Sequence, residues 1–81
     1  MNNAQVKQIL ESYGFEFEYH HDGFGDVWNH PRNKKLEITY NPKDKWIEAA
    51  TGKSVIFGME GMSFNEGSLK DNLNTIKKEI A

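Results

Sequence analysis

Hydrophobic residues in this chain change their spacing twice, from a helical period to a period of two and back again. Near the N-terminus, the i, i+3, i+4, i+7 positions of an amphipathic helix are occupied by Val6, Ile9, Leu10 and Tyr13. Asn3 is the expected cap of this helix and Gly14 its C-terminal stop. Near the C-terminus, a second apolar helical face contains Leu69, Leu73, Ile76 and Ile80, and residues 68–71 are similar to a capping box. A chain with this order of periods folds as helix, strands, helix.

The period of two lies between the helices. Phe15, Phe17 and Tyr19 alternate with polar residues, which predicts a strand with an aromatic inner face and an acidic outer face. The alternation predicts further strands at 26–30, closed by Pro31, at 36–40 and at 46–49. Asn41, Pro42 and Asp44 predict the turn between the last two. Residues 55–57 are either a short extra strand or a buried segment, and the glycines at 58, 61 and 67 predict a loop.

The expected fold class is therefore α+β, in the order α-β-β-β(-β)-α. Both helices are amphipathic, so both are expected on one face of an antiparallel sheet. At 81 residues, the chain is predicted to be a single domain, 1–81.

The composition of the chain excludes several classes of protein. The chain has no cysteine, which excludes a disulfide scaffold, a cysteine-based zinc finger and a thiol nucleophile. No apolar run approaches the length of a membrane span, and residues 1–3 lead into a helical pattern rather than a signal peptide. The expectation is a cytoplasmic protein without a cofactor.

Titratable residues gather between His20 and Pro31, a segment that contains all three histidines. Gly23 and Gly25 predict a tight turn, because glycine adopts positive φ at little cost. A histidine with a nearby acid can act as the general base on a ribose hydroxyl, so the candidate catalytic residues are His21 and His30, oriented by Asp22 or Asp26. The alternative is that these histidines have no specific role. No metal site is predicted, because adjacent residues such as His20 and His21 point to opposite faces of a strand.

The net charge of −2 is unevenly distributed. Residues 8–31 contain no lysine or arginine, whereas residues 32–53 are rich in them. If nucleic acid binds, its phosphates are expected to contact Arg32, Lys34, Lys35 and Lys53. A nucleic-acid binder usually has a larger basic excess, so an ordinary solvated surface of mixed sign is the alternative.

Three segments of the chain resemble the HicA family of small toxin RNases. Residues 6–15 are similar to the first helix and strand start of that family, and residues 67–70 to the opening of its last helix. Residues 23–31 are similar to its glycine, aromatic and His-Pro motif, but Gly25 stands at the position of the catalytic histidine. The resemblance implies a fold like that of double-stranded-RNA-binding domains, a toxin–antitoxin context and the loss of the family's RNA cleavage.

These observations lead to three hypotheses about function. The first is a non-catalytic binding domain that engages a protein or an RNA, with the acidic N-terminal half favouring a basic protein. The second is an active, metal-free RNA endonuclease that uses His21 or His30. The third is an inhibitor whose acidic face binds a nucleic-acid-binding protein.

Overall fold

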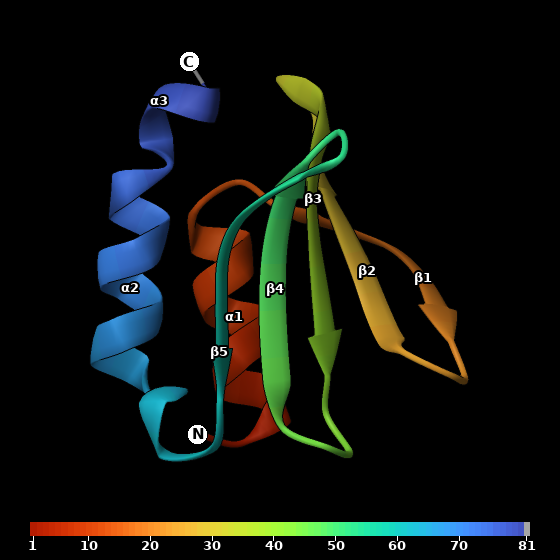
Figure 1. The fold of residues 1–81 in the computed structure, drawn as a ribbon, viewed down its shortest axis with the longest axis vertical. Helices are drawn as coiled ribbons and strands as arrows, with labels where there is room; N and C mark the ends of the chain where they lie inside the picture. The colour runs from red at the N-terminus through yellow and green to blue at the C-terminus, as the bar shows by residue number, and fades with distance from the viewer. Residues whose placement is uncertain (81) are drawn as a thin grey trace.

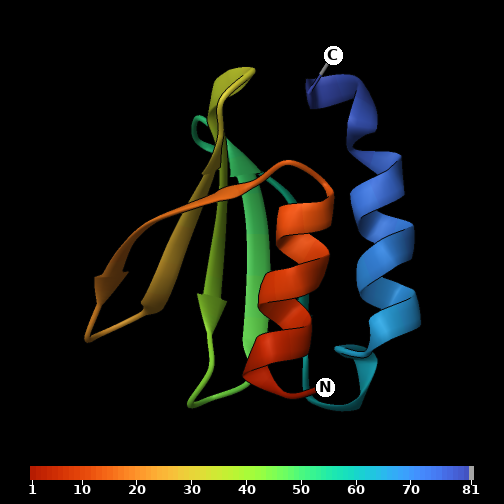
Figure 2. The same ribbon diagram turned by 180° about the vertical axis from the view of Figure 1, so that it is seen from behind.

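The computed structural model describes residues 1–80 and has two layers, a five-stranded sheet and a helical layer (Figures 1 and 2). In chain order, the elements are α1 (Asn3–Ser12), β1 (Glu16–His21), β2 (Gly25–His30), β3 (Asn33–Asn41), β4 (Trp46–Thr51), β5 (Ser54–Glu60), the 3-10 turn η1 (Gly61–Ser63), α2 (Glu66–Thr75) and α3 (Lys77–Ile80). The predicted α+β class and element order are confirmed, and β5 is part of the sheet. None of the helices within residues 1–80 has the length and apolar character needed to cross a membrane.

The sheet is an antiparallel meander in the order β1-β2-β3-β4-β5. Its helix-facing side carries the paired row Trp28, Ile38, Ala49 and Phe57. The helices cover this side only, as the two opposite views show, so the other side of the sheet is open (Figures 1 and 2). We call this second side the open face.

Local signals explain where α1 begins and ends. Asn2 caps the helix by accepting a hydrogen bond from the Gln5 backbone N–H, and the Gln5 side chain accepts one from the Asn2 N–H. This reciprocal arrangement is a capping box, so the predicted cap Asn3 is displaced by one residue. Gly14 follows the helix with φ +89°, which glycine adopts without steric cost.

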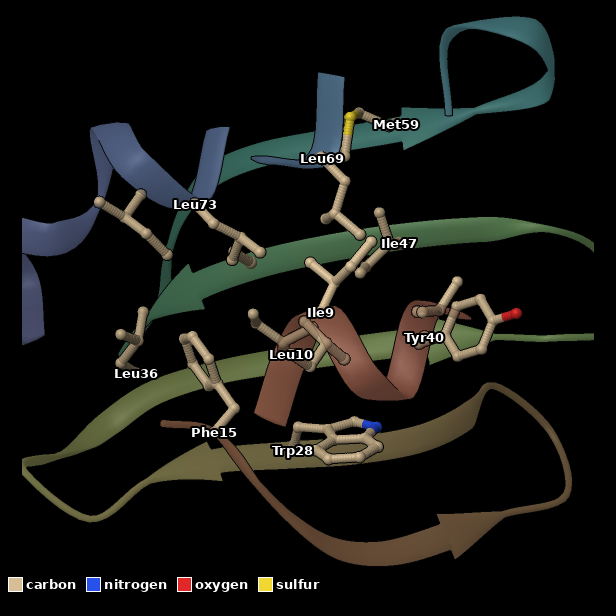
Figure 3. Packing of buried hydrophobic residues seen from close by; sticks show 14 residues of the cluster. Ile9, Leu10, Phe15, Trp28, Leu36, Tyr40, Ile47, Met59, Leu69 and Leu73 are labelled. Carbon is tan, nitrogen blue, oxygen red and sulfur yellow. The ribbon is translucent and has the colours of Figure 1, made fainter. Parts of the chain in front are cut away.

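The core lies between the sheet and the helices (Figure 3). The largest side chains in it that are almost fully buried are Trp28, Tyr40, Leu10, Leu36, Ile38, Ile47, Leu69, Leu73 and Ile76. α1 contributes Val6, Ile9 and Leu10 of its predicted apolar face, and the fourth residue of that face, Tyr13, packs partly buried against the core. Both amphipathic helices therefore bury the faces that their spacing predicts.

The predicted inner face of the first strand is wrong in part. Phe15 is buried, but Phe17 and Tyr19 are 51% and 45% exposed. A β-bulge between these two residues shifts the register of β1 against β2, and β1 extends beyond the helical layer. The alternation of apolar and polar residues therefore predicted the strand correctly, but no helix covers Phe17 and Tyr19.

Two predictions about the C-terminal half are also corrected. Gly58 lies within β5 and Gly67 within α2, so of the three glycines of the predicted loop only Gly61 lies outside both elements, in η1. The last helix begins earlier than expected, because the Asn65 side chain caps α2 by accepting from the Ser68 N–H. It is also interrupted at Ile76, so that α3 is a separate short helix.

Candidate functional site

The hairpin between β1 and β2 joins one histidine to two acids. The His20 ring lies with Nδ1 2.6 Å from the Asp26 carboxylate and Nε2 3.2 Å from that of Asp22. His20 and Asp26 are directly paired across the strands, so the register of the hairpin brings them together. The hydrogen bond to Asp26 is the main cause that raises the pKa of His20 above its ordinary value of 6.5.

The candidate catalytic residue His21 has no such acid. Its ring stacks on Phe24 with centroids 3.9 Å apart, and its Nδ1 accepts a hydrogen bond from the Gly23 N–H. Sequence reasoning assigned the acid to the wrong member of the His20–His21 pair. The missing signal was the hairpin register, which pairs residue 20 with 26 and residue 21 with 25.

The other candidate, His30, is only 5% exposed and both its ring nitrogens have backbone partners. Nε2 lies 3.2 Å from the Tyr13 carbonyl oxygen, to which it donates, and Nδ1 accepts from the Arg32 N–H at 3.1 Å. The edge of the ring also packs on Phe15, with centroids 5.1 Å apart. His30 therefore ties the end of α1 to the turn after β2.

The two turn glycines have different roles. Gly25 has φ +109° and is buried, and a Cβ there would lie 2.8 Å from Asn41 Cα and still closer to the Tyr40 carbonyl oxygen. Gly23 is not among the residues with positive φ, so the predicted reason for that glycine is wrong. At Gly25, the backbone of β3 leaves no room for any side chain.

Basic residues gather at the end of the molecule where the β2–β3 and β4–β5 turns and α3 lie together (Figure 1). Arg32 lines a hollow of about 400 Å³ with Lys77 of α3. The Lys35 carbonyl accepts from the Gly52 N–H, which brings the turn that contains Lys53 next to β3. Lys34 instead lines a different hollow, together with glutamates. The structure thus brings together the ends of the elements that carry these lysines and Arg32.

Glutamates dominate the open face. Glu37, Glu48 and Glu60 form a diagonal across β3, β4 and β5. Glu48 is paired with Thr39 on one side and with Gly58 on the other. Glu37 lies two residues before Thr39, and Glu60 lies two residues after Gly58. Glu16 pairs with Asn29, which in turn pairs with Glu37, so Glu16 and Glu37 lie in one row across the strands. Glu18 lines the same hollow as these two glutamates. We call Glu16, Glu18, Glu37, Glu48 and Glu60 the open-face glutamates.

The open-face glutamates are exposed, and none of them forms an ion pair with another of residues 1–80. Diagonal neighbours on adjacent strands are about 7–8 Å apart. At that separation, two carboxylates repel each other by about 0.5 kcal/mol in water. The folded chain tolerates this repulsion, and Lys34 is the basic residue that shares a hollow with three of these glutamates.

Two hollows lie on the open face. One, of about 460 Å³, is lined by Glu16, Glu18, Asn29, His30, Pro31, Lys34 and Glu37. The other, of about 590 Å³, is lined by Trp46, Ile47, Glu48, Gly58, Met59, Glu60 and Ser63. Both combine carboxylates with uncharged residues, and the first also contains Lys34. The carboxylates beside apolar surface suit basic side chains with aliphatic stems.

No protein family, curated protein or solved structure matches this chain. No group of three or more histidine, aspartate or glutamate side chains within residues 1–80 is arranged to hold a metal ion. The function of this domain is therefore inferred from its own geometry.

Proposed function

We propose that this domain binds a basic protein partner through the open face of its sheet. The observation that carries the proposal is the diagonal of Glu37, Glu48 and Glu60, continued by Glu16 and Glu18 on β1. A face with unpaired carboxylates and no covering helix attracts a partner of opposite charge and accelerates its association.

The geometry favours binding over RNA cleavage. A general base needs a free ring nitrogen, but both nitrogens of His30 have backbone partners. His21 has no carboxylate partner, and its Nδ1 accepts from the backbone. His20 shares a hollow with Lys43, but both of its ring nitrogens already face carboxylates, Nδ1 that of Asp26 and Nε2 that of Asp22.

The same surface supports the inhibitor hypothesis as the specific form of this function. A nucleic-acid-binding protein presents a basic surface, and a row of carboxylates can occupy the place of phosphates on it. The alternative partner, RNA, is favoured only by the basic end formed by the turns that contain Arg32 and Lys53 and by α3.

Backbone amide shifts in an NMR titration distinguish these partners. With hexalysine as the probe, we expect the largest shift changes at Glu37, Glu48 and Glu60, and we expect them to disappear at high salt. With a short RNA hairpin as the probe, we expect no saturable change. Changes that saturate with RNA and map to Arg32 and Lys53 would instead assign RNA binding to the basic end and contradict the proposal.

A further inference from the structure

The edge strand β1 is the most exposed part of the sheet. All six of its residues are exposed, although one edge of the strand is paired with β2. Its other edge has no partner strand within residues 1–80. Unpaired strand edges present rows of backbone donors and acceptors, and they are the places where proteins add a strand from a partner.

Two rows of side chains across the sheet end in solvent at β1. On the helix-facing side, the row of Trp28, Ile38 and Ala49 ends at Phe17, whose ring packs edge-on against Trp28 at 5.7 Å. On the open face, the row of Val27 and Thr39 ends at Tyr19. Both terminal residues are aromatic and about half exposed, so one more strand would bury apolar surface on both sides of the sheet.

The opposite edge of the sheet is less available. In β5, Ile56, Phe57 and Met59 pack into or against the core. The Asn72 side chain of α2 also contacts the Met59 sulfur at 3.5 Å. α2 lies on the β5 side of the molecule, whereas β1 projects away from both long helices (Figures 1 and 2).

The negative charge of β1 indicates which kind of segment can pair with its free edge. Glu16 and Glu18 flank Phe17, and residues 8–31 contain no lysine or arginine. A second copy of β1 would bring its own glutamates against these, and like charges on facing strands are destabilising. The glutamates and the bulge after Phe17 therefore protect this edge from self-association, while a basic segment is attracted to it.

We propose that β1 accepts an extended segment of the basic partner as a sixth strand, with apolar and basic residues in alternation. Its apolar side chains cover Phe17 on the helix-facing side. Its lysine or arginine side chains lie on the open face, where they meet Glu16, Glu18 and the ring of Tyr19. This inference depends on the proposed function, since it names the form in which the basic partner binds.

The probe for this proposal is an acetylated and amidated hexapeptide that alternates lysine and valine. Two N-methylated isomers serve as controls, one methylated at the lysines and one at the valines. Side chains and charge are the same in all three, but each isomer loses the N–H groups of one peptide edge. Strand addition uses one edge only, so we expect one isomer to bind at least about tenfold more weakly than the other.

Amide hydrogen exchange locates the bound peptide. We expect the unmodified peptide to slow exchange within β1, and the variant E16Q/E18Q to bind it at least about fivefold more weakly. The matched variant E37Q/E48Q, with the same change in charge, is expected to reduce its binding less.

Each result has a separate meaning. If both isomers bind as well as the parent peptide, strand addition is wrong and binding to the acidic face stands. If neither hexalysine nor the alternating peptide shifts any amide, the proposed function and this inference both fail. If the β1 amides become protected from hydrogen exchange when the protein concentration is raised without any peptide, the occupant of the edge is a second copy of this chain. That result overturns the inference.

Discussion

Replacing Gly25 with alanine tests whether only glycine can occupy the first position of β2, where the chain lies against β3. Gly25 has φ +109°, in which an L-residue is strained by about 1–2 kcal/mol. The new Cβ would also meet the backbone of Tyr40 and lie 2.8 Å from Asn41 Cα, and backbone atoms cannot rotate away. Overpacking of this kind costs a further 1–3 kcal/mol, roughly.

The expected loss for Gly25→Ala is therefore about 3 kcal/mol in the free energy of unfolding, worked from strain and overpacking together. In a domain of this size, each kcal/mol lowers the Tm by about 4–8 °C, so the Tm should fall by about 12 °C or more. Urea unfolding followed by tryptophan fluorescence measures the free energy, and a thermal scan measures the Tm.

Gly52→Ala is the matched control. Gly52 also has positive φ, +60°, but a Cβ there has no neighbour within 4 Å. Its expected loss is strain alone, about 1 kcal/mol. Equal losses for the two variants would show that the approach of Gly25 to β3 costs nothing, and would refute the reasoning.

The histidines allow two more tests of the account. His30→Ala leaves the Tyr13 carbonyl and the Arg32 N–H without their partner, so we expect a loss of about 3 kcal/mol in urea unfolding, against less than about 0.5 kcal/mol for the exposed His21→Ala. Similar losses for both would contradict the structural role of His30. The pairing of His20 with Asp26 raises the pKa of His20, so its contribution to stability is fully present below the ordinary value of 6.5 and is lost as the pH rises through the raised pKa. We expect the Tm of the wild type to fall relative to that of His20→Gln between about pH 6 and pH 8, and a constant difference would contradict this.

Local periodicity was sufficient to predict most of the fold. The apolar spacing of α1 and α2 identified the buried residues Leu10 and Leu69, and alternation identified Ile38 as a core residue. The turn after β3 was predicted from Asn41, whose side chain accepts from the N–H groups of Lys43 and Asp44.

The site residues depend on register and tertiary packing, which periodicity does not contain. Alternation placed Phe17 and Tyr19 together on an inner face, because it shows neither that β1 extends beyond the helices nor that a bulge turns Tyr19 to the open face. His30 was predicted as a candidate catalytic residue at the end of a strand, yet its ring is buried beside Gly14, where an added Cβ would lie 2.7 Å from the His30 Nε2. The diagonal of glutamates likewise exists only once β3, β4 and β5 are paired.

The affinity of two charge variants for hexalysine shows whether the open face itself binds basic segments. The open-face variant E37Q/E48Q/E60Q and the helix-layer variant E11Q/E66Q/D71N each remove three carboxylates, which changes the net charge from −2 to +1 in both. If exposed pairs contribute about 0.2–1 kcal/mol each, losing three on the open face costs about 0.6–3 kcal/mol and weakens binding by about threefold to about 150-fold. The account predicts this loss for the open-face variant and a much smaller one for the helix-layer variant. Equal weakening would mean that only net charge matters, and would contradict a binding role for the open face.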